Sequence, residues 1–275
     1  MSQSVLVLYD FSPGSRQALR VAHLWATWSG AELHLLHNLE GSYAPAMSDQ
    51  EVRQQVHAIS KAEAFNKVQR SFKKVTDEEI NPVNVHISIN SLATTVNQLL
   101  WEHNAQLLFA GLNDRGTLKR LFIGSTILRL LDMVRVPIVT IPKNVPVFQK
   151  LALHISVNYH YTFNSRALHQ FLQLMGDKAE KLVFLSVLTE DDDRPQATSH
   201  LESLKATFSD HPAVHTCLFE GNEPLDQVKT YMQAQTDGVL VVQKRSRAMT
   251  DYMFREFFIN ELVHDASLPL IILPE

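Results

Sequence analysis

The chain has 275 residues, of which 45% are hydrophobic and 20% charged, with only 9 glycines and 11 prolines. This composition excludes disordered, collagen-like and low-complexity proteins, and the length suits two α/β domains or one large one. The formal net charge is −4, and basic residues do not alternate with aromatic ones, so we do not expect a nucleic-acid-binding protein.

The cysteine content and the hydropathy pattern indicate the cellular compartment. Cys217 is the single cysteine, which excludes an internal disulfide. No apolar run reaches the roughly 20 residues of a membrane-spanning helix. The opening residues, MSQSVLVLYDFSPGS, lack the basic region and the cleavage site of a signal peptide. We therefore expect a cytoplasmic protein without a membrane span.

Apolar runs alternate with helical patterns along the first half. Strands are predicted near 4–9, 32–38, 83–89, 106–110 and 137–141, with helices near 13–28, 50–75, 94–103 and 123–134. Ser12 is expected to cap the first helix, with Pro13 at its first position and Gly30 after its end. Continuous apolar strands separated by helices predict a parallel sheet with both faces covered.

The second half repeats this pattern. Its strands are predicted near 151–157, 181–187, 213–219, 238–243 and 269–273, and Gly176 stands where Gly30 stood. Prolines bracket the last strand of both halves, and the stretch KNVPVFQK joins them. We therefore predict two α/β domains, residues 1–144 and 150–275. Their last strands, 137–141 and 269–273, are apolar edges that need cover.

Anion-binding features follow strands 1 and 4 of the first half. If the strand order is 3-2-1-4-5, the carboxyl ends of these two strands border the ligand crevice. Glycines let backbone N–H groups approach a polyphosphate, a helix start adds a positive dipole, and hydroxyl or basic side chains add hydrogen-bond donors. The candidate binding residues at these positions are Asp10, Gly111, Arg115, Gly124, Ser125 and Thr126.

The order of these motifs resembles a tandem universal stress protein along the whole chain. The resemblance rests on Asp10 with Ser12-Pro13, on a loop of the form G-2x-G-9x-G-S/T from Gly111, and on the later V-P-I-V. It implies two tandem doubly wound domains, each a five-stranded parallel sheet in the order 3-2-1-4-5, packed as an intramolecular pseudo-dimer. It also allows a further homodimer and protein partners.

The same resemblance implies a stress-response function with ATP or AMP as ligand, ATP together with magnesium. Asp10 would contact the adenosine part, and Gly111, Gly124 and Ser125 the phosphates. The chain departs from the family pattern at Asp114, where the second loop glycine is expected and where a carboxylate repels a polyphosphate.

The second half departs further from the pattern. Alignment of Pro137 with Pro269 leaves none of the loop glycines or the following hydroxyl in place: the positions of Gly111, Asp114, Gly124 and Ser125 hold Gln243, Ser246, Glu256 and Phe257. The acid after strand 1 becomes Asn158 or Tyr159, depending on a one-residue gap. We therefore expect nucleotide binding in the first domain only.

Two other functions remain open beside this regulatory module: a nucleotide-free scaffold for protein partners and a slow ATP or AMP hydrolase. No nucleophile elbow, P-loop or Cys/His pair is visible, so we expect no catalytic residues. We also expect no metal site, because three histidine pairs lack the spacing of a zinc motif: His34 with His37, His154 with His160, and His211 with His215. The acidic run 190–193 is interpreted as a solvated loop.

Overall fold

The computed structural model describes residues 3–39, 50–112, 129–235, 237–244, 259, 261–263 and 267–275. These residues group into two compact units. The first unit takes the described residues up to 112, together with 129–134 and 141–144. The second takes 135–140 and the described residues from 145 onward.

Strands and helices alternate in the first unit as the sequence predicts. The elements are β1 (Ser4–Leu8), α1 (Pro13–Ser29), β2 (Glu32–Asn38), α2 (Gln50–Thr76), a 3-10 turn (Pro82–Asn84), β3 (Val85–Ser88), α3 (Leu92–Glu102) and β4 (Ala105–Leu112). The next strand, β5 (Ile138–Pro142), is divided between the units, with 138–140 in the second and 141–142 in the first. The hydrogen-bonded strand order is β3-β2-β1-β4-β5, and β1 runs parallel to β2 and β4. The predicted order 3-2-1-4-5 is confirmed here. The first half of the helix predicted at 123–134, up to residue 128, lies outside the described residues.

Local signals define both ends of α1. The Ser12 hydroxyl accepts a hydrogen bond from the Ser15 amide at 3.1 Å, and Pro13 occupies the first helical position. Gly30 ends the helix with a φ of 64°, a conformation that costs glycine little. Between these ends, Trp25 is buried and its ring meets that of Phe109 edge to face. The cap and the end of the helix therefore form as predicted.

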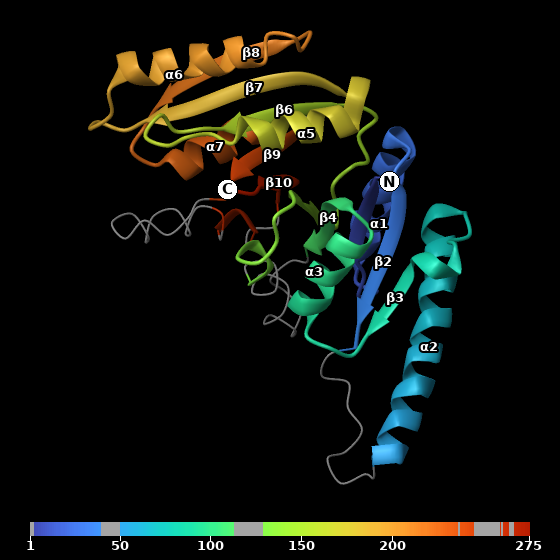
Figure 1. Cartoon of the computed structure of the whole chain (residues 1–275). Coiled ribbons are helices and arrows are strands. Elements are labelled where there is room, and N and C mark those ends of the chain that lie inside the picture. Colours follow the sequence, from blue (N-terminus) through green and yellow to red (C-terminus); the bar gives the residue numbers. More distant parts are fainter. Residues whose placement is uncertain are drawn as a thin grey trace. The chain divides into compact units, whose positions relative to one another are not determined.

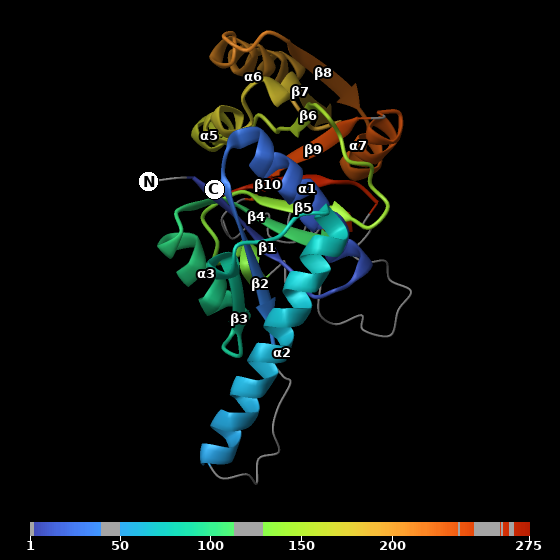
Figure 2. The ribbon, with the colours of Figure 1, turned by 90° about the vertical axis from the view of Figure 1, so that its right-hand side faces the viewer.

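Helix α2 is much longer than the strands beside it. Its 27 residues correspond to roughly 40 Å, against roughly 13 Å for the four residues of β3. Figure 1 and Figure 2 both show the start of α2 extending past the end of the strands of its unit. Burial is confined to its second half, where Ala64, Val68 and Phe72 share one face. The first half of α2 is largely exposed.

The second unit repeats the architecture. Its elements are β6 (Leu151–Ser156), α5 (Ser165–Met175), a 3-10 turn (Gly176–Lys178), β7 (Ala179–Leu188), α6 (Arg194–Thr207), β8 (Val214–Glu220), α7 (Pro224–Gln233), β9 (Gly238–Gln243) and β10 (Leu270–Leu273). The strand order is β10-β9-β6-β7-β8 with parallel pairing throughout. Numbered within the unit and read from β8, this order is again 3-2-1-4-5. Gly176 ends α5 with a φ of 56°.

The predicted edge strand β10 has a partner on its open side. Leu270, Ile271 and Ile272 pair antiparallel with Thr140, Val139 and Ile138 of β5, all six residues belonging to the second unit. Each residue of β10 is buried. Antiparallel pairing of two apolar strands satisfies backbone groups that an open edge would leave to solvent or to other chains. The cover that the sequence requires for strand 269–273 is therefore supplied by this chain.

The sheets form the core of each unit. The inner strands β1, β4, β6 and β9 are buried along nearly their whole length. This is the burial of parallel strands covered by helices on both faces. Within the described part of the chain, no helix combines the length and hydropathy needed to cross a membrane.

Candidate functional site

The carboxyl ends of β1 and β4 lie side by side in the first unit. The two strands pair in parallel, with Val7 opposite Phe109. Asp10 follows β1 and is exposed, and Gly111 stands near the end of β4. The structure therefore brings these two predicted residues to the same edge of the sheet, where ligands of doubly wound folds bind.

The turn after β1 has a defined shape. Asp10 Oδ1 accepts a hydrogen bond from the Ser12 amide at 2.9 Å. Between these residues Phe11 has a φ of 64°, which is strained for a bulky side chain. A carboxylate accepts hydrogen bonds at both oxygens, so Asp10 keeps capacity for donors from a ligand.

A cluster of rings and one lysine surrounds Phe11. Its ring meets those of Tyr9 and His37 at centroid distances of 5.1 and 4.7 Å, and Lys67 Nζ lies 4.2 Å from its centroid. His37 Nδ1 donates to the carbonyl oxygen of Tyr9 at 2.7 Å. Burial lowers the pKa of His37, while this hydrogen bond and the nearby Asp10 act in the opposite direction.

Sequence reasoning missed His37 and Lys67 as neighbours of the crevice. His37 lies near the end of β2, which is the neighbour of β1 in the predicted strand order. That order could therefore have indicated His37 as a residue near Asp10. Lys67 lies in the middle of α2 among other polar residues, and no sequence signal distinguishes it.

Gly111 has a packing role that the motif does not reveal. A Cβ atom at this position would lie 2.1 Å from the backbone carbon of Gly14 and 2.2 Å from the amide nitrogen of Ser15. The end of β4 thus packs directly on the first turn of α1. Glycine is needed here whether or not a phosphate binds. The remaining candidates, Arg115, Gly124, Ser125 and Thr126, and the departure at Asp114, lie outside the described residues.

The second unit shows which residue replaces Asp10. The amide of Val157 donates to the Leu185 carbonyl at 2.9 Å, as the amide of Tyr9 donates to Leu36 at 2.9 Å. Asn158 Oδ1 then accepts from the His160 amide at 2.9 Å, which repeats the Asp10 turn. Of the two alternatives left open by the sequence, Asn158 is the counterpart. A neutral amide has replaced the carboxylate.

The side chain of Gln243 occupies the position that corresponds to Gly111. Its Oε1 accepts from the Asn164 amide at 2.7 Å, and its Nε2 donates to the Thr162 carbonyl at 3.3 Å. Asn164 is the cap of α5, with Oδ1 accepting from the Ala167 amide. In a phosphate site, the backbone amides at a helix start donate to the bound anion. Here the Asn164 amide donates to the Gln243 side chain instead.

The acidic run in the second unit forms a turn in which Glu190, Asp191 and Asp193 are exposed, as the solvated-loop interpretation expects, whereas Asp192 is partly buried and hydrogen-bonded. Asp192 Oδ1 lies 3.1 Å from Tyr159 Oη and 2.8 Å from His160 Nε2, while Oδ2 accepts from the amide and hydroxyl of Thr189, both at 2.8 Å. Burial opposes ionisation of Asp192, but these hydrogen bonds prevail and lower its pKa. Asp193 caps α6 through the Gln196 amide.

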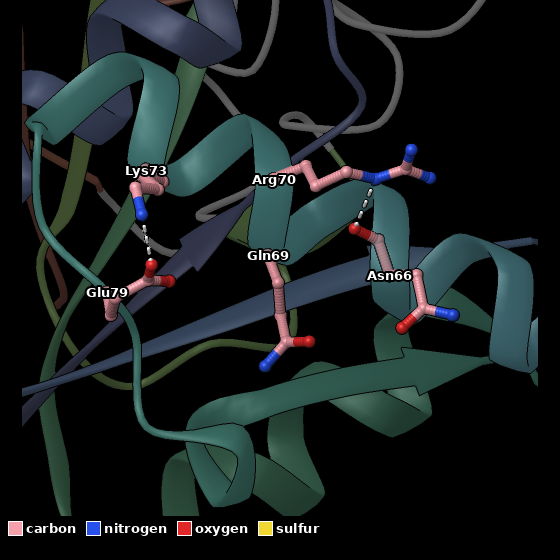
Figure 3. Close-up of a pocket in the computed structure, with 5 residues that line it drawn as sticks. All are labelled: Asn66, Gln69, Arg70, Lys73 and Glu79. Atoms are coloured by element: carbon pink, nitrogen blue, oxygen red, sulfur yellow. Dashed lines mark hydrogen bonds and ion pairs between the residues drawn. The ribbon is translucent and has the colours of Figure 1, made fainter.

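An open hollow on α2 offers no comparable site. Figure 3 shows its lining, which is Asn66, Gln69, Arg70, Lys73 and Glu79. Lys73 pairs with Glu79 at 2.6 Å, and Arg70 Nε donates to the Asn66 carbonyl at 3.2 Å. The charged groups of the Lys73–Glu79 pair are mostly exposed and serve each other, so we do not assign a ligand to the hollow.

The chain resembles known proteins in sequence and in fold. The model of the universal stress protein family matches residues 1–142. A universal stress protein from Archaeoglobus fulgidus has a similar structure, with a TM-score of 0.67, 15% identity, and 98% of each chain covered. A protein of Pseudomonas aeruginosa UCBPP-PA14, described as a universal stress protein, gives a TM-score of 0.60 at 15% identity, covering 99% of this chain and 92% of that one.

The fold also occurs in the cytoplasmic domain of a prokaryotic cation chloride cotransporter. That domain has a TM-score of 0.52 and 14% identity, with 99% of this chain and 95% of that chain covered. No curated protein sequence matches significantly. At these identities the structures show the fold alone, whereas the family model covers more than half of the chain. The chain therefore belongs to the universal stress protein family.

Proposed function

We propose that this is a cytoplasmic stress-response protein whose first unit binds ATP or AMP as a regulatory ligand, and whose second unit does not. The observation that carries the proposal is the contrast between equivalent positions of the two units. An exposed carboxylate, Asp10, stands beside Gly111 and the start of α1. Asn158 and the hydrogen-bonded Gln243 occupy these positions in the second unit.

The chemistry of the first crevice suits the sugar of a nucleotide. Asp10 Oδ1 is held by the Ser12 amide, and the strained turn at Phe11 is fixed by packing with Tyr9 and His37. A carboxylate positioned in this way accepts hydrogen bonds from ribose hydroxyls without paying for its own ordering. The phosphates would then extend toward the loop after β4, as the motif from Gly111 implies.

Calorimetry with ATP and AMP, with and without magnesium, tests the proposal. We expect one site per chain with micromolar or weaker affinity. Asp10→Asn should weaken binding by about tenfold or more, since hydrogen bonds to a charged acceptor contribute about 1.5–3 kcal/mol. The control is Asp177→Asn, an acid of the second unit whose side chain is 85% exposed. No binding by the unaltered protein would contradict the proposal and favour the nucleotide-free scaffold.

Asp114→Gly should tighten binding, because it removes a negative charge from the phosphate loop that the family resemblance implies. Unchanged binding in this variant would contradict the repulsion argument.

The same proposal excludes rapid turnover. Phosphoryl transfer needs positioned charge and a group that orients the attacking oxygen. The turn at Asp10 supplies hydrogen-bond acceptors and the amide donors of the helix start. It does not supply a general base positioned to take a proton from the attacking hydroxyl. Steady-state ATPase measurements with magnesium should therefore give rates well below about 10 s⁻¹, a typical enzyme value. Several turnovers per second that vanish in Ser125→Ala would overturn this and favour the hydrolase.

A further inference from the structure

Three histidines far apart in the sequence meet in the first unit. His34 comes from β2, His86 from β3, and His103 from the residue that ends α3. One ring nitrogen of each lies within 4.8 Å of those of the other two. His34 Nδ1 is 3.1 Å from His86 Nε2, and the centroids of the His34 and His103 rings are 4.0 Å apart.

This histidine cluster lies away from the Asp10 crevice. His34 is opposite Leu6 in the middle of β1, and the carbonyl of His103 accepts from the hydroxyl of Ser4 at the start of that strand. Asp10 follows the other end of β1. At about 3.3 Å per residue, the four positions from Leu6 to Asp10 span roughly 13 Å. The cluster is thus separate from the proposed nucleotide site.

One nitrogen of the cluster is buried without a hydrogen bond. The His34 side chain is only 4% exposed, and its Nε2 has no hydrogen-bond partner among the described residues. The nearest acid is Glu32, whose Oε2 lies 3.7 Å away. Leaving a buried polar atom unpaired costs about 1–3 kcal/mol. With His34 Nδ1, which faces His86, as the ligand atom, the buried Nε2–H faces the Glu32 carboxylate, an outer partner of the kind that metal-bound histidines commonly have.

The charged groups around the cluster favour a cation. Glu32 beside His34 and Glu102 beside His86 add negative charge, and the carboxyl end of α3 adds its dipole at His103.

We propose that His34, His86 and His103 bind a divalent transition-metal ion, Zn²⁺ in the first instance. Three imidazoles with a remaining position are a common ligand set for zinc, at Zn–N distances of about 2.0–2.1 Å. Tetrahedral geometry then separates ligand nitrogens by about 3.3 Å. The 3.1 Å between His34 and His86 is already close to this value, and small ring rotations would bring in His103. The half-burial of His86 and His103 leaves the ion a path from solvent.

No sequence motif indicates this site. Zinc motifs are recognised by ligands a few residues apart, whereas 52 residues separate His34 from His86. Only the parallel pairing of β2 with β3 places the two rings on adjacent strands, and only the end of α3 brings the third. The expectation of no metal site rested on short spacings.

Titration of the full chain, without a polyhistidine tag and stripped of metal, tests the proposal. Zn²⁺ is added as the only metal, and a chromophoric chelator competes with the protein for it. We expect one Zn²⁺ bound per chain. His86→Gln and His103→Gln should each lower the affinity for Zn²⁺ by about tenfold or more, since loss of a residue that only hydrogen-bonds a metal ligand already has an effect of that size. The control is His57→Gln on α2, outside the cluster. Circular dichroism confirms that each variant is folded.

Cobalt provides the second measurement. Co²⁺ bound at a tetrahedral site absorbs intensely in the visible region, and we expect this band in the unaltered protein and in His57→Gln but not in His86→Gln. The assignment would be overturned if the protein has no Zn²⁺ site, if His86→Gln and His103→Gln bind Zn²⁺ as tightly as the unaltered protein, or if Co²⁺ gives an octahedral spectrum in the folded protein. The cluster would then be a stack of neutral rings that serves packing only.

Discussion

The Cβ atom that Gly111 lacks would lie 2.1 Å from the backbone carbon of Gly14. Real Cβ atoms do not approach backbone so closely, so any other residue at 111 must push β4 away from the first turn of α1. This turn carries the Ser12 cap and follows Asp10. The packing of the strand and the shape of the candidate crevice therefore depend on the same pair of glycines.

Gly111→Ala should lower the free energy of unfolding by about 2 kcal/mol or more, in the range of forced overpacking. Urea unfolding followed by circular dichroism measures this. Gly221→Ala is the matched control, because a Cβ there would meet only the flexible side chain of Gln227, at 2.8 Å. An equal effect of the two substitutions would contradict the proposed role of the Gly111 contact.

Asp192→Asn should destabilise the second unit by about 2 kcal/mol, because four hydrogen-bonding groups converge on its carboxylate. Asp191→Asn, an exposed neighbour in the same acidic run, should change stability little. Since the folded pKa of Asp192 is lowered, its contribution is present above the ordinary value of 3.8 and is lost as the pH falls below it. Unfolding curves measured at pH 7 and pH 3 should show the stability loss of Asp192→Asn mainly at pH 7. Equal losses of stability in Asp192→Asn and Asp191→Asn at pH 7 would refute the argument.

Acid should weaken the second unit through His154. This residue of β6 is 1% exposed, its Nδ1 lies 2.9 Å from Tyr231 Oη, and burial lowers its pKa from 6.5 to about 4. The charges that act on it are Lys181, which lowers the pKa, and Asp237, which raises it. The unfolded chain binds the proton more tightly, so stability is full above pH 6.5 and falls toward pH 4, by about 3 kcal/mol in all.

Urea unfolding at pH 7 and pH 4.5 measures this dependence. His154→Gln should reduce the loss of stability between the two pH values, whereas His169→Gln, at an exposed position of α5, should leave it unchanged. The same pH dependence in all three proteins would show that His154 is not responsible.

Gln243→Ala should cost about 1 kcal/mol, because the Asn164 amide at the start of α5 loses its acceptor. The substitution should not create a nucleotide site, since Asn158 still lacks a carboxylate. Calorimetry with ATP, in a background with Asp10→Asn, checks the second point; new binding would show that Gln243 alone closes this crevice. Gln98→Ala, which removes an exposed hydrogen bond to Glu102, is the stability control.

Local features of the structure could be predicted from the sequence. Ser12, Pro13 and Gly30 define α1 through the conformations of neighbouring residues, and continuous apolar runs define the strands through burial. The repeat of these signals in the second half predicts the same strand order there. Such features depend on short stretches of chain, so one sequence contains enough information for them.

Tertiary structure decided the features that join distant residues. The sequence left Asn158 and Tyr159 as alternatives, and the hydrogen bond from His160 selected Asn158. Gly111 was assigned to phosphates, and its contact with Gly14 became visible only when β4 lay against α1. His34, His86 and His103 meet because parallel pairing and the end of α3 bring them together. Composition and spacing contain no record of such contacts, since they depend on which strands are neighbours and on how the side chains between them pack.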